Sequence, residues 1–385
     1  MSVFWNPEPQ RVVVAMDSFK GSLSATKVSE LIGETWQGFR PQDTVEIFPM
    51  ADGGEGTVDA IATSLGRSPE YIEVYNATHE RRCKAPILFA DHKAYIDLAS
   101  CCGIESAPNA NPWLADTWGL GSAIAYAIKE GATSIIVGIG SSASSDGGWG
   151  MLRAMEQILV ERGSDEPSQS YGLESLRNIS PEEVHRVISK LTEVRLPKIL
   201  IMSDVTTKLK DSIALFGPQK GFKADEIEDA TEVLMNYAKN VEEFDELDGS
   251  GAAGGVGFAL LALGGIMNVG ADFLAKYTGL RAALARADVV ITGEGRYDAS
   301  SAAGKLPHFV ATNARPGAAK ILLCGSISRE SDVSTAFDYN GCLLDYCSYE
   351  DAMRNADIRL PYAVLRLFGS ACVHDHIKPE NFGIR

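Results

Sequence analysis

Short apolar runs recur along the chain, and each leads into a loop rich in glycine, serine or acidic residues and then into a helical pattern. The first run, residues 11–16 (RVVVAM), precedes the loop at 17–22, and Ser24 has the character of an N-cap for the helix that follows. A second run, residues 44–49 (TVEIFP), precedes the loop at 50–56 and another helical stretch. Two successive strand–loop–helix units predict a parallel sheet in an α/β protein.

The same pattern is clearest in residues 133–151 (TSIIVGIGSSASSDGGWGM). Residues 135–137 predict a buried strand, residues 138–148 a glycine- and serine-rich loop, and the following MLRAMEQILV a helix. The free N–H groups at such a helix start favour an anion, and glycines let a phosphate approach closely. Asp146 would repel that phosphate. Its presence therefore fits a divalent cation between the two, or a carboxylate that accepts a proton from a hydroxyl.

The pattern changes in the middle of the chain. Residues 71–77 and 82–99 predict strands joined by short turns, as in a meander. Further predicted elements are a helix at 113–130, strands at 199–202, 287–292 and 320–324, a turn at 216–221, an acidic amphipathic helix at 224–244 and a glycine loop at 249–257 that opens a helix. The predicted strands near both chain ends are all short apolar runs that lead into a loop, so we expect both ends to build one domain.

Length and composition narrow the class of protein. The chain has 385 residues, which at about 150 residues per domain suggests two or three domains. A net charge of −16 argues against nucleic acid and anionic membranes as partners. The seven cysteines form no CxxC pair, the first residues do not resemble a signal peptide, and the longest apolar stretch, 256–269, is too short to span a bilayer. We therefore expect a cytoplasmic protein with reduced thiols.

Acidic residues stand just beyond predicted strand ends at seven places, although any one alone would be an ordinary turn or capping residue. They are Asp17, Asp52, Glu55, Asp146, Asp204, Glu294 and Asp298. Strand ends converge at one edge of a parallel sheet, so these carboxylates are expected to line one cleft. Lys20, Lys220 and Lys305 lie in glycine-flanked loops beside them, and lysine suits phosphate oxygens. Carboxylates, glycine loops and lysines together indicate metal-assisted phosphoryl transfer.

Other enzyme classes fit the sequence less well. Leu306 follows Gly304-Lys305, so there is no Walker A motif, and the HRD and DFG motifs of protein kinases are absent. The stretch Gly138-x-Gly140-x-x-Ala143 matches the dinucleotide pattern and keeps an oxidoreductase open as an alternative. However, the expected position of its ribose-binding acid, near Glu161, follows no predicted strand. No G-x-S-x-G elbow supports a serine hydrolase.

Six segments resemble, in the same order, the signatures of the type 2 glycerate kinases. They are DSFKGSLSA (17–25), ADGGEGT (51–57), DGG (146–148), FGPQKG (216–221), GSGAAGGVG (249–257) and ITGEGRYD (291–298), the last followed by GKLP (304–307). The resemblance implies ATP-dependent phosphorylation of D-glycerate, typically to 2-phosphoglycerate. It also implies a flavodoxin-like parallel-sheet domain and a restriction-enzyme-like mixed α/β domain, with the active site in the cleft between them. The set of carboxylates separately predicts that activity requires Mg²⁺ or Mn²⁺.

The chain departs from the family pattern near the expected acceptor pocket. The family's GIGGSATNDGG loop is GIGSSASSDGG here, with Ser141 and Ser145 in place of Gly and Asn. A TTSxGTGE-like stretch has become ADTWGLGS (115–122), and the DVTNPL motif has become DVTTKL (204–209), with a shortened segment before FGPQKG. These changes leave a related small hydroxy acid open as the acceptor.

These observations together define an expected architecture and site. We expect residues 1–70 and 270–385 to form the flavodoxin-like domain, residues 71–269 the second domain, and the protein to be a monomer or homodimer. Asp146, Asp204 and Lys20 are expected to be catalytic, with Asp204 or Asp146 as the base. Substrate or nucleotide contacts are expected from Asp17, Ser18, Ser22, Gly53, Gly54, Gly140, Ser142, Ser144, Lys220, Gly254, Gly255, Arg296 and Lys305, and metal contacts from Asp52, Glu55, Glu294 and Asp298.

Overall fold

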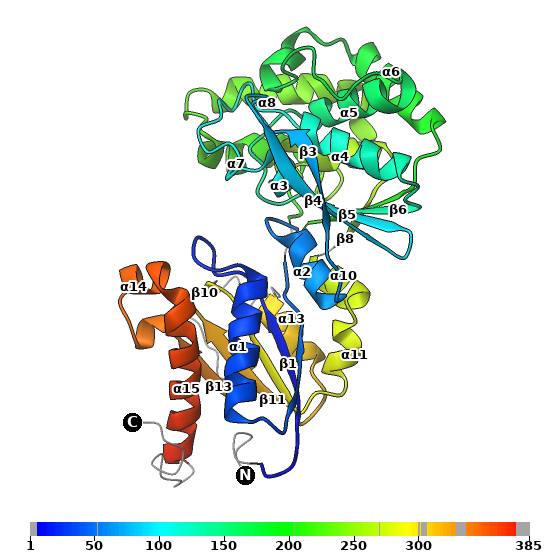
Figure 1. The fold of residues 1–385 in the computed structure, drawn as a ribbon. Coiled ribbons are helices and arrows are strands. Elements are labelled where there is room, and N and C mark those ends of the chain that lie inside the picture. The colour runs from blue at the N-terminus through cyan, green and yellow to red at the C-terminus, as the bar shows by residue number, and fades with distance from the viewer. Residues whose placement is uncertain are drawn as a thin grey trace. The chain divides into compact units, whose positions relative to one another are not determined.

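The computed structural model divides the chain into two compact units (Figure 1). It describes residues 6–51, 53–203, 205–268, 270–298, 301, 306–328 and 336–374. One unit comprises Met1–Ala51, Thr63–Gly66 and Ala271–Arg385, and the other comprises Asp52–Ala62 and Arg67–Gly270. We name them the five-stranded unit and the six-stranded unit after their main sheets.

The five-stranded unit is built on a parallel sheet with the order β13-β11-β9-β1-β2. Its strands are β1 (Arg11–Met16), β2 (Thr44–Ile47), β9 (Val289–Gly293), β11 (Ala319–Cys324) and β13 (Tyr339–Cys342), and a small second sheet pairs β10 (Arg296–Tyr297) with β12 (Ser326–Ile327). The helices are α1 (Ala25–Phe39), α10 (Gly270–Tyr277), α11 (Leu280–Leu284), α13 (Leu306–Asn313), α14 (Tyr349–Arg354) and α15 (Ala356–His374), with a 3₁₀ turn at Leu343–Asp345.

Helices cover both faces of this sheet, which explains why its strands are apolar throughout. On one face Val12, Val14 and Ile291 pack against α1 and α15, where the rings of Trp36 and Phe368 meet edge to face at 5.1 Å. On the other face Leu322 and Cys324 share a cluster with Ala311 of α13. Ser24 caps α1 by accepting a hydrogen bond from the backbone N–H of Lys27, as predicted.

The six-stranded unit contains a mixed sheet with the order β3-β4-β5-β6-β7-β8. Its strands are β3 (Glu70–Tyr75), β4 (Arg82–Ala90), β5 (Lys93–Asp97), β6 (Ser134–Gly138), β7 (Lys198–Met202) and β8 (Ile266–Asn268), antiparallel from β3 to β5 and parallel from β5 to β8. The helices are α2 (Thr57–Ser64), α3 (Leu98–Cys102), α4 (Trp118–Lys129), α5 (Trp149–Met155), α6 (Pro181–Glu193), α7 (Ser212–Lys220), α8 (Ile227–Ala238) and α9 (Val256–Ala262).

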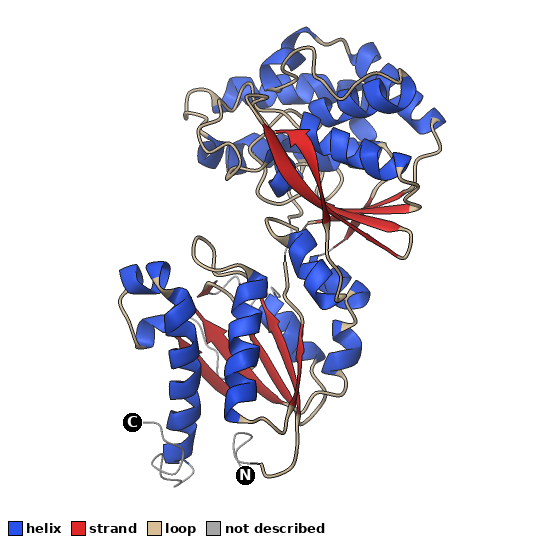
Figure 2. Ribbon diagram, in the orientation of Figure 1, coloured by secondary structure: helices blue, strands red, loops and turns tan. Residues whose placement is uncertain are grey.

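Short helical segments complete this unit: a π-helical segment at Glu156–Val160 and 3₁₀ segments at Leu173–Asn178, Leu209–Asp211, Lys239–Phe244 and Ala252–Gly255. Most helices of the unit gather on one side of the sheet (Figure 2). One large core joins them to it, and Trp118 and Trp149 are fully buried there. Across the described residues, no helix combines the length and the apolar character needed to cross a bilayer.

The α/β class, the parallel sheet and the antiparallel meander agree with the sequence predictions. The predicted turn at 216–221 is wrong, because these residues form the end of α7 and the glycine that terminates it. Gly221 has φ 104°, and the N–H of Phe222 bonds the carbonyl of Gly217, which is a helix ending that uses a left-handed residue. The Gly-Pro pair inside the segment gave a turn signal that the packing of α7 overrides.

A test of the parallel sheet uses Gly293, where β9 passes close to β11. A β-carbon at this position would lie 1.6 Å from the carbonyl oxygen of Leu323, so Gly293→Ala forces the strands apart. We expect it to lower the free energy of unfolding by about 2 kcal/mol or more. Gly38→Ala in α1 is the matched control, because a β-carbon there meets no atom within 4 Å and alanine favours the helix. Denaturant unfolding followed by circular dichroism measures both, and equal stability of the two variants would contradict the register.

Candidate active site

Three glycine-rich segments meet at the carboxyl ends of β6 and β7 in the six-stranded unit. The N–H of Gly140 donates to the carbonyl of Gly53 over 2.8 Å, which joins the loop after β6 to the ADGGEG segment. A β-carbon at Gly53 would lie 2.5 Å from the carbonyl of Met202, at the end of β7. The N–H of Gly147 donates to the carbonyl of Gly254 over 2.9 Å and joins the same loop to the GSGAAGGVG segment. The structure therefore brings three sequence-distant motifs together.

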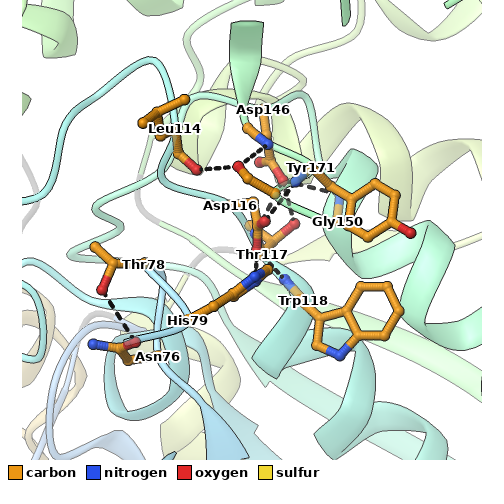
Figure 3. A network of polar contacts seen from close by, with 12 residues as sticks. Asn76, Thr78, His79, Leu114, Asp116, Thr117, Trp118, Asp146, Gly150 and Tyr171 are labelled. Atoms are coloured by element: carbon orange, nitrogen blue, oxygen red, sulfur yellow. Dashed lines mark hydrogen bonds and ion pairs between the residues drawn. The ribbon is translucent and has the colours of Figure 1, made fainter. Parts of the chain in front are cut away.

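Asp146 holds the loop after β6 in place from its buried side. Its carboxylate is fully buried and accepts hydrogen bonds from the N–H of Thr117 (3.0 Å), the hydroxyl of Thr117 (2.7 Å), and the N–H groups of Gly148 (3.2 Å) and Gly150 (3.0 Å), as Figure 3 shows in part. Burial, together with the nearby charge of Asp116, raises the pKa of Asp146 to about 6, while the bonds from Thr117 and Gly150 oppose that rise. Asp146 is therefore held as an ion above pH 6, inside the protein.

Lys220, the last residue of α7, points its ammonium group at this loop. Its Nζ donates to the carbonyl oxygen of Ser144. A β-carbon on Gly254 would lie 2.9 Å from this Nζ atom. Burial lowers the pKa of Lys220 to about 8, and the charge of Asp146 opposes that change. A glycine at 254 thus leaves room for the cation beside the loop. In the same loop, the hydroxyl of Ser142 lies 2.9 Å from the hydroxyl of Ser144.

Glu55 forms a carboxyl pair with Glu105 at the same edge of the sheet. Burial raises the pKa of Glu55 to about 7, and a hydrogen bond and charge repulsion from Glu105 add to the effect, with a smaller contribution from Asp97. Among the described residues no group of three or more His, Cys, Asp or Glu side chains has a metal-binding arrangement.

The other described site residues lie in the five-stranded unit, where β1 and β9 end side by side. The N–H of Asp17 donates to the carbonyl of Gly293 over 2.9 Å, and the N–H of Gly325 donates to the carbonyl of Glu294 over 3.1 Å. Loops after three neighbouring parallel strands therefore converge at one point. The sheet order reverses between β1 and β9, which is where open α/β sheets bind ligands.

The predicted site residues thus fall into two groups within the described part of the chain. Gly53, Gly54, Glu55, Gly140, Ser142, Ser144, Asp146, Lys220, Gly254 and Gly255 lie in the six-stranded unit, and Asp17, Ser18, Lys20, Ser22, Glu294, Arg296 and Asp298 lie in the five-stranded unit. Asp52, Asp204 and Lys305 fall outside the described residues.

Sequence reasoning missed four residues that shape the site: His79, Glu105, Asp116 and Thr117. The altered stretch 115–122 was the only signal for Asp116 and Thr117. Nothing in the sequence marked His79, which belongs to a hairpin turn, or Glu105, which follows a short helix. Only the fold brings them to the loop.

Comparison with known proteins identifies the family. Residues 12–368 match the model of the glycerate kinase family. The chain belongs to this family. It is 32% identical over 332 residues to glycerate kinase of Bacillus subtilis strain 168, covering 84% of this chain and 86% of the relative. It is 33% identical over 317 residues to glycerate 2-kinase of Escherichia coli K12, covering 79% and 82%. The family membership makes this chain a kinase, that is, a phosphotransferase, in preference to an oxidoreductase.

A solved structure supports the same assignment. The crystal structure of a protein from Salmonella typhimurium LT2, assigned as a glycerate kinase 2, superimposes with a TM-score of 0.73 at 30% identity. The match covers 96% of this chain and all of the other. The similarity between this glycerate kinase family member and that protein therefore extends over nearly the whole chain and is not confined to a single motif.

One departure from the family loop now has a physical reading. Ser141, which stands where the family pattern has glycine, adopts φ 57° in the left-handed region. Its carbonyl accepts a hydrogen bond from Ile104, and its side chain is exposed. The conformation that glycine adopts freely is thus retained with serine at a modest cost, since a non-glycine residue there pays about 1–2 kcal/mol. This substitution alters the loop surface more than its course.

Lys220 provides a test of the site. Since burial lowers its pKa to about 8, the ammonium charge is present below pH 8 and is lost above it, and turnover that needs this charge should fall as the pH rises through 8. Lys220→Met should lower kcat/KM by about 10²-fold and remove that alkaline limb. Lys210→Met, at an exposed lysine paired with Glu246, is the control. A Lys220→Met enzyme with the wild-type rate and pH profile would exclude Lys220 from the site.

Proposed function

We propose that this protein transfers the γ-phosphate of ATP to D-glycerate, with 2-phosphoglycerate as the product and a divalent metal as cofactor. The observation that supports this most is the convergence of the loop after β6, the GSGAAGGVG segment and Lys220 at one place in the six-stranded unit. Backbone N–H groups, hydroxyls and a lysine at that point suit an anionic substrate. The names of the relatives, glycerate kinase and glycerate 2-kinase, suggest its identity.

Lys220 supplies the positive charge that this site needs in a chain of net charge −16. In the transition state of phosphoryl transfer, the oxygens of the transferred group carry negative charge, and a positioned cation stabilises that charge most where water is excluded. Ser142 and Ser144 are buried, and the hydroxyl of Ser142 and the ammonium group of Lys220 both donate to the carbonyl of Ser144. These hydroxyls are donors that add no charge. We assign these three residues to the anionic groups of the reactants.

The five-stranded unit is proposed to contribute the nucleotide-binding residues. Numbered in chain order, its strands β2, β1, β9, β11 and β13 run 2-1-3-4-5, which is the flavodoxin-like order. In that fold ligands bind where the order reverses, and here the loops that begin at Asp17 and Glu294 lie at that point. Lys20 is exposed in the first of these loops and Arg296 in the second. We propose that these loops bind ATP.

The carboxylates of the chain suit Mg²⁺ by their chemistry, since this ion prefers oxygen ligands and is commonly held by one or two carboxylates with the substrate phosphates. Glu55, Glu294 and Asp298 are the described candidates for that role. When bound, the ion would neutralise charge on the phosphate oxygens. Since no three described His, Cys, Asp or Glu side chains form a metal-binding group, the residues present fit an ion held by one or two carboxylates and completed by the phosphates of the nucleotide.

The base that accepts the proton of the glycerate hydroxyl stays a prediction for Asp146 and for Asp204. Asp146 already accepts four hydrogen bonds from the protein and has no exposed surface, which suits a positioning role. We therefore prefer Asp204 as the base and Asp146 as the residue that shapes the loop.

A panel of acceptors tests the proposed function directly. The enzyme is incubated with ATP and, separately, with D-glycerate, L-glycerate, glycolate, D-lactate and tartrate, and ADP release is followed. We expect the highest kcat/KM with D-glycerate, because the family pattern is retained over most of the chain. ³¹P NMR of the product distinguishes the 2-phosphate from the 3-phosphate. Higher kcat/KM with another hydroxy acid would replace the acceptor while keeping the kinase class.

Removal of divalent metal is a separate test. We expect turnover to stop in excess EDTA and to return with Mg²⁺ or Mn²⁺, because the phosphate charge otherwise lacks a counter-ion at the acidic strand ends. Circular dichroism in EDTA serves as the control for folding. Full turnover in EDTA would show that lysine and backbone donors alone stabilise the transferred group.

A further inference from the structure

His79 occupies the turn between β3 and β4 in an uncommon backbone conformation. Its φ is 59°, in the left-handed region that non-glycine residues seldom adopt. The turn is closed by the bond from its N–H to the carbonyl of Asn76 (3.1 Å), and Thr78 donates its hydroxyl to the Asn76 side chain (Figure 3). Such strain persists where the surroundings require it, and the side chain placed by this turn is the imidazole of His79.

That imidazole meets a fully buried carboxylate. The Nε2 atom of His79 lies 2.9 Å from Oδ1 of Asp116, whose side chain has no exposed surface, while the histidine side chain is 15% exposed. Asp116 also accepts from the N–H of Trp118 (2.9 Å) and of Tyr171 (2.8 Å). Its own N–H donates to the carbonyl of Ala77 over 3.0 Å. The hairpin turn and residue 116 are thus joined at two points.

Asp116 directly precedes Thr117, which holds Asp146 with both its N–H and its hydroxyl. Thr117 also accepts a hydrogen bond from the N–H of Met151, so this one residue connects the segment at 116–118 with α5. A continuous series of contacts therefore runs from Asp116 through Thr117 to Asp146, and from there to the loop that faces Lys220.

The charges around this chain of contacts are few. Asp146 is faced by Asp116, Lys220, Tyr237 and the Cys102 thiol, and Asp116 by His79, Asp146 and Cys102. Two buried carboxylates are therefore set against one lysine and one histidine. Removing Asp116, Asp146 or His79 therefore changes the electrostatic field at Lys220 as well as the positions of the residues in this series of contacts.

We propose that His79 and Asp116 are positioning residues for the phosphoryl-transfer site: they hold Thr117, and through it Asp146 and the serine–glycine loop, in the arrangement that aims Lys220. This inference rests on the proposed function of that loop. Within the described part of the chain, their hydrogen bonds join them to each other and to residues 76–77, 118 and 171, not to Lys220 or the serines of the loop, so we assign neither a catalytic role.

The experiment compares His79→Ala, His79→Gln and Asp116→Asn with His185→Ala, an exposed histidine on α6. With ATP and D-glycerate, we expect His79→Ala and Asp116→Asn to lower kcat/KM roughly tenfold to a hundredfold, as a small misplacement of a site can do. His79→Gln retains a donor and should restore most of the activity, while His185→Ala should match the wild type. Since Asp146 is ionised only above about pH 6, turnover should also fall on the acid side of that pH. Asp116→Asn should move this acid limb to lower pH, because it removes a charge that raises the pKa of Asp146.

Hydrogen exchange measured by mass spectrometry gives a second readout that needs no turnover. We expect faster exchange in peptides covering residues 117–118 and 147–151 in His79→Ala and Asp116→Asn, and not in His185→Ala. If the wild type does not phosphorylate glycerate but these peptides loosen, the proposed function fails and the positioning role stands. Wild-type kinetics and wild-type exchange in a folded His79→Ala enzyme would overturn the positioning role, even if Asp116→Asn cannot be purified.

Discussion

The carboxylate of Asp146 is the contact on which the candidate site depends. A buried carboxylate is costly unless several donors surround it, and here four do, from Thr117, Gly148 and Gly150. A hydrogen bond to a charged group typically contributes about 1.5–3 kcal/mol, so each donor is strongly constrained in position. Two of them belong to the turn that starts α5, and the others to residue 117, which is remote in sequence. The loop after β6 is therefore shaped by contacts from its buried side.

The glycines of the site serve the same arrangement at a second level. Gly254 has φ 66°, and a β-carbon there would collide with the carbonyl of Ser144 at 2.2 Å. The GSGAAGGVG segment can approach the loop only because this side chain is missing, and the same gap leaves room for the ammonium group of Lys220. The absence of a side chain at Gly254 thus allows two contacts of the loop that Asp146 holds: one with the GSGAAGGVG segment and one with the ammonium group of Lys220.

Apolar runs predicted the inner strands of both main sheets, because a strand buried on both faces, such as β1, leaves a short continuous apolar stretch. The short edge strands β8 and β13 have no such run, and the sequence did not predict them. The acidic and glycine-rich loops were found for the same reason, since they begin where those runs stop. Asp116 and His79 could not be predicted, because their importance lies in a contact between a hairpin turn and a helix start 37 residues away. The end of α7 was misread because a Gly-Pro pair is a local signal, whereas Gly221 ends the helix through bonds that only the folded chain forms.

Electrostatics explains how an acidic chain can serve anionic reactants. A net charge of −16 spread over the surface is screened within about 8–10 Å at physiological ionic strength, whereas a cation in a partly desolvated site is screened much less. Lys220 is such a cation, and burial alone would tend to discharge it, as its lowered pKa shows. The negative charge of Asp146 counters that tendency and keeps the lysine protonated near neutral pH. The buried carboxylate thus has two effects through one position: its hydrogen bonds shape the loop, and its charge favours the protonated form of Lys220, the cation that we propose for the anionic substrate.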